Sequence, residues 1–309
     1  MTDPWRQRKI ARVFPRRTSY TPTDDLVFFD GPPLERIPCD EVHVSCVFGW
    51  DRPRAERLVK LWREQNYTVL LGGPAYNSVA SDFIPGLYVR HGFTTTSRGC
   101  IRRCPFCLVP QREGALRLLE IKPGWEIMDN NLLACPRGHI EAVCAMLDNQ
   151  PRPAKFTGGL DSRLCRPWFA SRLTKMRVQV IHTAYDLPAE KAHVERTIKM
   201  LRDAGLGHRQ VCCYVLAGYE GDTPAAAEER LNWVFALGGL PFAMFYRGPA
   251  EPIRKVPKPW HALIRKWTRP AAIFAHKRIL GAAPLFTQAT ARSERQEDAP
   301  LFAGQEKPY

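Results

Sequence analysis

The chain has 309 residues, of which 45% are hydrophobic and 25% are charged, and its formal net charge is +14. This length and apolar content predict a globular protein with two modest domains, or one domain with an appendage. The ten unevenly spaced cysteines exclude the dense disulfide framework of a small secreted domain. The basic charge favours contact with a polyanion, and a basic surface that serves only solubility is an equal alternative.

No apolar run reaches the length of a membrane span. The longest candidate, residues 233–246, is short and is broken by Gly238, Gly239 and Pro241. Residues 5–17 are rich in arginine and lysine and contain no apolar signal core. We therefore expect a soluble, cytoplasmic protein with no membrane partner.

Residues 1–90 predict an abbreviated Rossmann-like region. The run "EVHVSCVF" indicates a strand, residues 52–65 indicate a helix with Ala55, Leu58, Leu61 and Trp62 on one face, and "YTVLLGGP" indicates a second strand. Together they form one βαβ unit. The upstream runs "ARVFPRR" and "DLVFFDG" add one or two strands, too few for a full doubly wound domain.

Residues 91–249 show strand candidates that alternate with helical segments. This order predicts a parallel sheet, open or closed into a barrel, with about six β/α units. The strand candidates are "FTTTS", "WEIMD", "AKFTG", "VQVIHTA", "VCCYVLAG" and "FAMFY".

Two helices in this region carry clear terminal signals. We expect the first over residues 188–205, with a cap from Asp186, the stripe Val194, Ile198 and Leu201, and a stop at Gly205. We expect the second to begin at its cap Thr223 and to end at Gly238, with Leu231, Val234 and Phe235 packed inside.

Residues 250–309 predict a basic C-terminal extension. We expect an extended basic segment, "PIRKVPKPWHALIRKWTRP", one helix over residues 271–280, and a disordered tail from about Gln288. The basic residues alternate with Trp260 and Trp267, a combination suited to phosphates and stacked bases.

Three cysteines, Cys100, Cys104 and Cys107, lie in the spacing C-x3-C-x2-C within "RGCIRRCPFCLVP". An electron-transfer [4Fe–4S] centre uses four thiolates, and no fourth cysteine follows here until Cys135. Three thiolates on a four-iron cluster leave one iron free to bind another molecule.

Two other interpretations of the cysteines stay open. Cys104 and Cys107 can form a zinc site with Cys135 and His139, but this leaves Cys100 without a role. The cysteines outside the motif can ligate an auxiliary cluster, although most of them lie in apolar runs, where free cysteine behaves as a small hydrophobe. Cys135, next to Pro136, is the main exception.

The motif resembles the signature of the radical S-adenosylmethionine superfamily, C-x3-C-x-aromatic-C after the first barrel strand. Cys100, Cys104, Phe106 and Cys107 match it, and "FTTTS" supplies the strand. The resemblance implies a partial (β/α)6 barrel and a [4Fe–4S] cluster held by the three catalytic cysteines. It also implies that S-adenosylmethionine binds the open iron and is cleaved to a 5′-deoxyadenosyl radical, with Phe106 near the adenine. The electron comes from an external donor of the flavodoxin or ferredoxin type.

Polar residues at later strand ends extend the resemblance over residues 92–247. Asp129, Asn130 and Asn131 resemble the acidic and amide pair that holds the methionine amino group, where other members have Gly-Gly-Glu. Gly158-Gly159 is followed by Leu160 in place of that glutamate, so Asp129 and Asn131 are preferred. The remaining expected cofactor contacts are Asp161, Arg163, Asp186, Gly218 and Tyr219.

Two of these contacts have structural alternatives. Asp186 can simply cap the following helix. Gly218 and Tyr219 belong to "GYEGDT", which resembles the family's fifth-strand turn with Asp222 in place of the usual glutamate, and this segment also reads as a plain glycine turn.

The N-terminal unit is similar to the last βαβ unit of the cobalamin-binding domains that precede many such barrels. The D-x-H-x-x-G hallmark of those domains is absent, so bound cobalamin is not expected.

The expected substrate is a nucleic acid or nucleotide, because Arg98, Arg102, Arg103 and Arg112 surround the cysteines. A peptide or small metabolite is the alternative substrate. In a different class, the chain is a non-catalytic iron–sulfur or zinc protein that binds nucleic acid.

Overall fold

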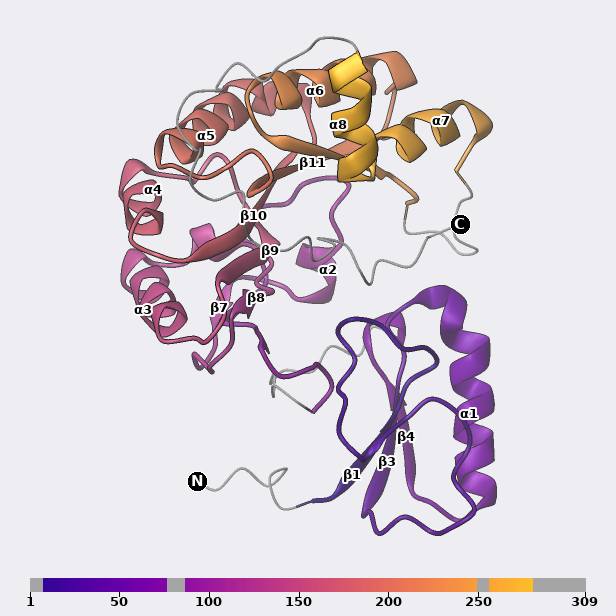
Figure 1. The fold of residues 1–309 in the computed structure, drawn as a ribbon. Coiled ribbons are helices and arrows are strands. Elements are labelled where there is room, and N and C mark those ends of the chain that lie inside the picture. The colour runs from indigo at the N-terminus through magenta and orange to yellow at the C-terminus, as the bar shows by residue number, and fades with distance from the viewer. Residues whose placement is uncertain (1–7, 77–86, 249–255, 280–309) are drawn as a thin grey trace. The chain divides into compact units, whose positions relative to one another are not determined.

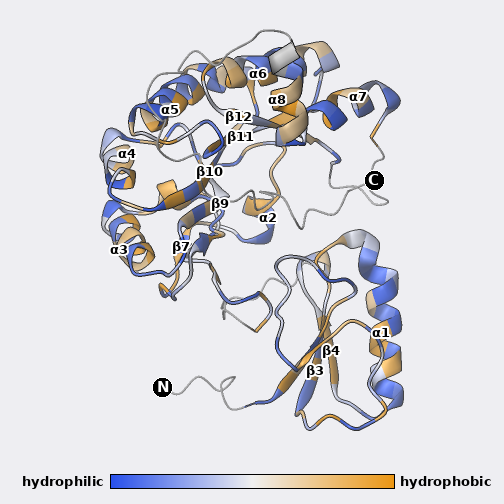
Figure 2. Cartoon of the chain, in the orientation of Figure 1, coloured by the Kyte–Doolittle hydropathy of each residue, from blue (hydrophilic) through white to orange (hydrophobic). Residues whose placement is uncertain are grey.

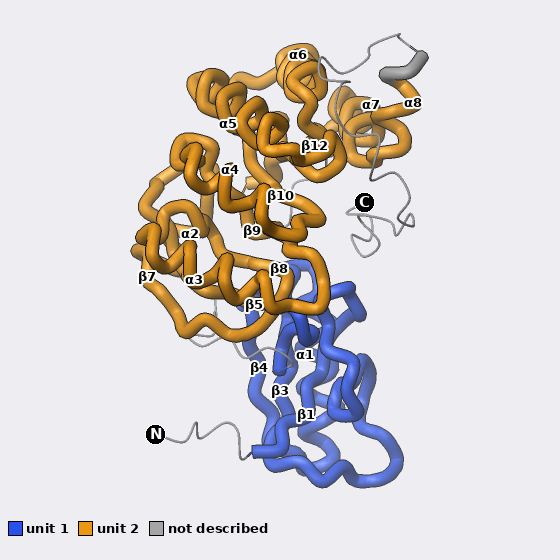
Figure 3. The backbone as a smooth tube through the Cα atoms, turned by 60° about the vertical axis from the view of Figure 1, so that its left-hand side comes forward, with its two compact units in different colours: residues 1–93, 251–253, 297–309 blue, residues 94–250, 254–296 orange. Residues whose placement is uncertain are grey.

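The computed structural model describes residues 8–76, 87–248 and 256–279. These residues form two compact units, and the chain passes from the first to the second between Phe93 and Thr94 (Figure 3). Both units are of the mixed α/β type with parallel sheets, which confirms the expected α/β class.

The first unit contains a four-stranded parallel sheet in the order β2-β1-β3-β4 (Figure 1). Its elements are β1 (Ile10–Val13), β2 (Val27–Phe28), β3 (Glu41–Ser45), the 3-10 turn η1 (Gly49–Asp51), α1 (Arg52–Glu64), β4 (Val69–Gly72) and η2 (Pro74–Tyr76). The expected βαβ unit is β3-α1-β4, and the two upstream runs are β1 and β2.

Helix α1 buries one face against this sheet and presents a mostly hydrophilic outer side (Figure 2). Leu61 was expected on the buried face, but it is 45% exposed, and Val59 is buried in its place. The reason is the helical period, since Ala55, Leu58, Val59 and Trp62 recur at spacings of three and four residues.

The second unit contains a six-stranded sheet in the order β12-β11-β10-β9-β8-β5. The four pairings from β8 to β12 are parallel. All six expected strands are therefore present, and they lie in the sheet in chain order. Their bounds are β5 (Phe93–Thr94), β8 (Glu126–Ile127), β9 (Ala154–Leu160), β10 (Val178–Tyr185), β11 (Val211–Ala217) and β12 (Leu240–Phe245).

A helix follows each of the strands β8 to β11, and the four helices lie along one side of the sheet (Figure 1). They are α3 (Arg137–Asp148), α4 (Pro167–Leu173), α5 (Lys191–Asp203) and α6 (Pro224–Ala236). The short turns η3 (Leu132–Ala134) and η4 (Pro188–Glu190) precede α3 and α5. This alternation brings the carboxyl ends of the parallel strands to one edge of the sheet.

The two helices with clear terminal signals are present, and one cap differs from the prediction. Thr223 accepts a hydrogen bond from the Ala226 amide (3.2 Å) and caps α6 as expected. Asp186 does not cap the other helical segment. Instead, Glu190 Oε2 accepts hydrogen bonds from the amides of Asp186 (3.0 Å) and Leu187 (3.2 Å).

The sequence prediction of an extended basic segment near residue 260 is wrong. Residues 258–267 form the amphipathic helix α7 (Lys258–Trp267), which packs against β12, and α8 (Pro270–Ile279) follows it as expected. Trp260 is 8% exposed and Trp267 is fully buried, so neither ring lies on the surface for base stacking. The expected disordered tail lies outside the described residues.

None of the helices in the described part of the chain combines the length and apolar character that a membrane crossing requires.

Candidate functional site

The three motif cysteines lie in a loop between two short antiparallel strands, β6 (Ser97–Arg98) and β7 (Arg117–Leu118), and the loop also contains α2 (Val109–Arg112). The loop is closed at its base, where the Cys100 amide donates to the Gly114 carbonyl (3.4 Å). Gly99 is required there, because its φ is +79° and a Cβ would lie 2.2 Å from the Ala115 carbonyl oxygen. We call residues 99–116 the cysteine loop.

Three consecutive side chains after β8 hold the start of the cysteine loop. Asp129 accepts hydrogen bonds from the Thr96 amide (2.6 Å), the Thr96 hydroxyl (2.7 Å) and the Ser97 hydroxyl (2.6 Å). Asn130 Oδ1 accepts from the Gly99 amide (2.9 Å). Asp129 thus holds Thr96 and Ser97, and Asn130 holds Gly99, the residue before Cys100.

The third side chain, Asn131, reaches the first cysteine itself. Its Nδ2 donates to Cys100 Sγ (3.5 Å). Asn131 is 4% exposed, and its Oδ1 is buried without a hydrogen-bond partner among the described residues. A buried acceptor without a partner is costly, which makes this oxygen a candidate contact for a bound molecule.

Asp161 and Arg163, which follow β9, form a charged network with the cysteine loop. Asp161 accepts from Arg102 Nε (3.0 Å) and Arg163 Nε (2.7 Å), and Arg163 also pairs with Glu190 (3.2 Å). Burial alone would raise the pKa of Asp161, but the hydrogen bonds from Arg163 and Arg102 outweigh it and hold that pKa low. The hydrogen bond to Asp161 raises the pKa of Arg163, and a contact with the Cys104 thiol adds to this shift.

Asp186, which follows β10, lies within electrostatic reach of the third cysteine. Burial raises the pKa of Asp186 to about 7, and the neighbouring Glu190 adds to the effect. Burial also raises the pKa of the Cys107 thiol, with further contributions from Cys104, Cys100 and Asp186. These mutual effects place the three thiols and the carboxyl group within electrostatic reach of one another.

Phe106 contacts the turn after β11. Its ring meets Tyr219 edge-on with centroids 5.5 Å apart, and Tyr219 meets Tyr246 in the same way at 5.0 Å. A Cβ on Gly218, whose φ is +78°, would lie 2.4 Å from the Phe245 ring. The turn borders a cavity of about 320 Å³ lined by Gly218, Tyr219, Glu220, Gly221, Asp222, Tyr246 and Trp260.

Asp222, which stands where the family pattern has glutamate, is fixed from two sides. Its carboxylate accepts from both terminal nitrogens of Arg230 (3.0 and 2.9 Å), and its Oδ2 also accepts from the Gly218 amide (2.9 Å). The same Arg230 bonds the Leu216 carbonyl (2.8 Å). The shorter side chain therefore still anchors the turn to α6 and β11.

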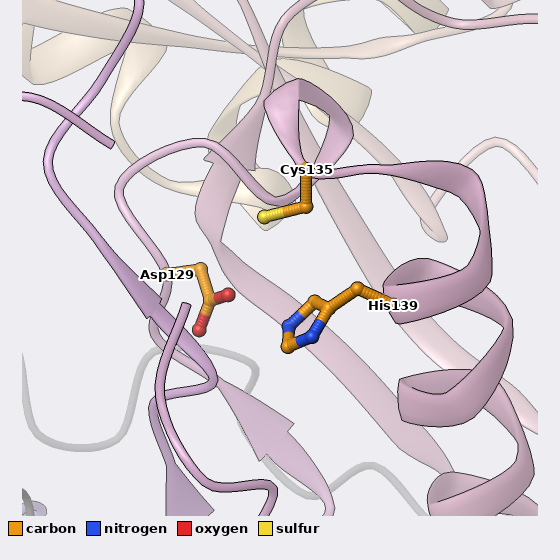
Figure 4. A group of neighbouring side chains, drawn as sticks. All are labelled: Asp129, Cys135 and His139. Atoms are coloured by element: carbon orange, nitrogen blue, oxygen red, sulfur yellow. The ribbon is translucent and has the colours of Figure 1, made fainter. Parts of the chain in front are cut away.

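The zinc interpretation that joined Cys104 and Cys107 to Cys135 and His139 is not supported. Among the described residues, the one group of three or more ligand atoms within 4.8 Å of one another is Asp129, Cys135 and His139 (Figure 4). Cys135 and His139 thus lie together, but with Asp129 and without the motif cysteines.

The spread of the three motif sulfurs matters for what they can hold. They do not all lie within 4.8 Å of one another. A single zinc ion holds sulfur at about 2.3 Å, so two of its sulfur ligands are at most about 4.6 Å apart. A four-iron cluster accepts each thiolate on a separate iron, so the wider spread fits a cluster.

The other cysteines are poor candidates for an auxiliary cluster. All ten are free thiols, and the three motif cysteines are half-buried. Six others are buried: Cys46, Cys135, Cys144, Cys165, Cys212 and Cys213. Of these six, Cys135 alone belongs to a group of three ligand atoms within 4.8 Å of one another among the described residues, whereas the others lie among apolar side chains of the core, and burial raises the pKa of Cys212 to about 12.

The four arginines in and beside the cysteine loop divide into two pairs. Arg98 forms an ion pair with Glu113 (3.1 Å) and Arg102 forms one with Asp161 (3.0 Å), so both have internal partners. Arg103 and Arg112 are exposed. Sequence reasoning treated the four alike because the acidic partners are 15 and 59 residues away.

Two functional side chains were missed by the sequence analysis. Glu190 accepts hydrogen bonds from the amides of Asp186 and Leu187 and pairs with Arg163, but Leu187 stands where the known capping signal has Ser or Thr, so no sequence pattern marked it. No sequence pattern marks Arg230 either, because it lies in α6 and its partner Asp222 is eight residues earlier, in the turn before that helix.

Comparison with known proteins adds no assignment. No protein-family model matches the sequence, and no curated protein is significantly similar to it.

Proposed function

We propose that the protein is a radical S-adenosylmethionine enzyme whose catalytic centre is a [4Fe–4S] cluster held by Cys100, Cys104 and Cys107. The observation that carries the proposal is the convergence of four strand ends on the cysteine loop. Asn131 contacts Cys100, Arg163 interacts with Cys104, Asp186 lies within electrostatic reach of Cys107, and Tyr219 packs on Phe106.

The sheet supports the same proposal. Six strands in chain order, with a helix after each of β8 to β11, have the topology that a partial (β/α)6 barrel requires. The cysteine loop lies between the first and second strands of this order, where the family has its motif. The cavity beside Tyr219 fits the expected adenine position.

The residues of the chain have separate roles in this proposal. The three cysteines hold the cluster, and Asp129 and Asn130 position the loop. Asn131 Oδ1 is the acceptor we assign to the amino group of S-adenosylmethionine, because it is a buried acceptor without a hydrogen-bond partner among the described residues and its side chain contacts Cys100.

Four further side chains would surround the cofactor. Arg163 and Asp186 lie at neighbouring strand ends, and the Phe106 and Tyr219 rings would exclude water beside the adenine. A bound cluster would supply one-electron reduction of the sulfonium of S-adenosylmethionine, with the electron from a flavodoxin- or ferredoxin-type donor, and thereby hydrogen-atom abstraction from the substrate.

The decisive test is anaerobic reconstitution with iron and sulfide, followed by dithionite and S-adenosylmethionine. We expect iron–sulfur absorption and slow release of 5′-deoxyadenosine without added substrate. Replacement of Cys100, Cys104 and Cys107 by alanine abolishes both signals, whereas Cys144→Ala, a buried cysteine on α3, retains them. A reconstituted cluster that releases no 5′-deoxyadenosine would support the alternative, a non-catalytic iron–sulfur protein.

For the substrate we propose a nucleic acid or nucleotide, met by the exposed Arg103 and Arg112. Two phosphate contacts predict a slope of about −1.8 for log K against log salt on duplex DNA, and Arg103→Gln lowers its magnitude by about 0.9. Lys175→Gln, at an exposed lysine after α4, is the matched control. A slope near zero would favour a peptide or small metabolite.

A further inference from the structure

A second cluster of ligating side chains lies beside the cysteine loop and is not used by the proposed chemistry. Asp129 follows β8, Cys135 follows η3, and His139 lies in the first turn of α3. The carboxylate, thiol and imidazole point toward one another (Figure 4), and their ligand atoms all lie within 4.8 Å.

The donor set is that of a zinc site. Zinc binds sulfur at about 2.3 Å, and nitrogen and oxygen at about 2.0–2.2 Å, so ligand atoms on one ion are at most about 4.6 Å apart. The cluster approaches this spacing in the structure as it stands. We propose that Asp129, Cys135 and His139 form a binding site for one divalent ion of the zinc type, separate from the three motif cysteines.

The burial of Asp129 supports the site independently of the spacing. Asp129 is 1% exposed, and within the described residues it forms no ion pair. Its three hydrogen bonds come from neutral donors, the Thr96 amide and the Thr96 and Ser97 hydroxyls. Burying a carboxylate without a cation is costly, and a bound divalent ion would offset that cost.

The surroundings resemble the outer shell of a metal site. The hydroxyls of Thr96 and Ser97 hold the Asp129 carboxylate, and Thr96 Oγ1 also lies 3.2 Å from His139 Nε2. Such partners orient metal ligands, and their loss typically costs about 10–100-fold in affinity. The ion would tie α3 and the chain after β8 to the segment that leads into the cysteine loop.

The test uses the full chain with Cys100, Cys104 and Cys107 replaced by alanine, so that metal on the cysteine loop does not contribute. We expect one zinc per chain, and with Co²⁺ in its place the absorption of a thiolate–cobalt bond. Cys135→Ala in this background removes that absorption, and His139→Gln lowers affinity by more than about 10-fold. Cys144→Ala, on the same helix, changes neither.

A second variant and a second measurement test the proposal even if a ligand variant folds poorly. Ser97→Ala leaves all three ligands in place and lowers Co²⁺ affinity by about 10–100-fold, and zinc raises the melting temperature of the background protein but not of its His139→Gln variant. The proposal is overturned if the background protein binds neither metal, or if binding survives in both Cys135→Ala and His139→Gln. None of these results depends on whether the motif cysteines hold a cluster.

Discussion

Gly99 and Gly114 offer a direct test of how the cysteine loop is held. Both have positive φ, +79° and +74°, and both lie at the base of the loop. A Cβ on Gly99 would lie 2.2 Å from the Ala115 carbonyl oxygen, whereas a Cβ on Gly114 would meet nothing within 4 Å. Alanine therefore adds backbone strain at both positions and a collision at one only.

The magnitudes of the two substitutions differ for this reason. Left-handed backbone costs an alanine about 1–2 kcal/mol, which predicts a fall in melting temperature of about 2–8 °C for Gly114→Ala. Gly99→Ala carries the same cost, and in addition the loop base must open, which displaces Cys100 from the Gly114 carbonyl. A displacement of about 1 Å at a catalytic centre costs about 100-fold in rate.

The assay is iron content after anaerobic reconstitution, together with 5′-deoxyadenosine release. We expect Gly114→Ala to assemble the cluster as the unsubstituted protein does, and Gly99→Ala to fall toward the level of the protein without its three cysteines. Circular dichroism and thermal unfolding show whether each variant folds. Equal iron content and equal product release in the two folded variants would refute the role of this contact.

Four further outcomes follow from individual side chains. Asn131→Leu removes the bond to Cys100 and the free Oδ1, and we expect a weaker Kd for S-adenosylmethionine by calorimetry while iron content changes little. In iron-free protein, the raised pKa of Asp186, about 7 against 3.8, makes the folded state hold its proton more tightly. The free energy of unfolding, measured in urea, therefore falls by up to about 4 kcal/mol as the pH rises from 4 to 7. The Asp186→Asn variant does not show this fall. Trp267→Ala lowers the free energy of unfolding by about 3–5 kcal/mol, since the ring is fully buried, whereas a base-stacking residue would leave stability unchanged. Thr223→Ala removes a helix cap and costs about 1 kcal/mol in the same measurement.

The strands of the second unit could be predicted because each is a short apolar run bounded by polar residues, and the order of runs fixes a parallel sheet. The C-terminal region shows where such reasoning failed. Trp260, Leu263, Ile264 and Trp267 have the spacing of a helix face, and Pro259 lies in the first turn, where proline is tolerated. The prediction gave the prolines and basic residues more weight than this three- and four-residue spacing. It therefore placed an extended segment where the structure has an amphipathic helix.

The contacts around the cysteines could be predicted only in part. A polar residue after each strand is visible in the sequence, so the positions of Asn131, Arg163 and Asp186 were expected. Which atom each would meet depends on how the loop lies across the sheet. Arg102 pairs with Asp161 because both lie at the carboxyl edge of the strands, and no local pattern links residues 59 positions apart.

The loop crosses the strand ends in a consistent order. Asn131, after β8, contacts Cys100, Arg163, after β9, interacts with Cys104, and Asp186, after β10, lies within electrostatic reach of Cys107. The three sulfurs do not all lie within 4.8 Å of one another, whereas the ligand atoms of Asp129, Cys135 and His139 do. The wider spread favours a multi-iron cluster at the cysteine loop, because each thiolate then binds a separate iron, and the closer spacing favours a single ion at Asp129, Cys135 and His139.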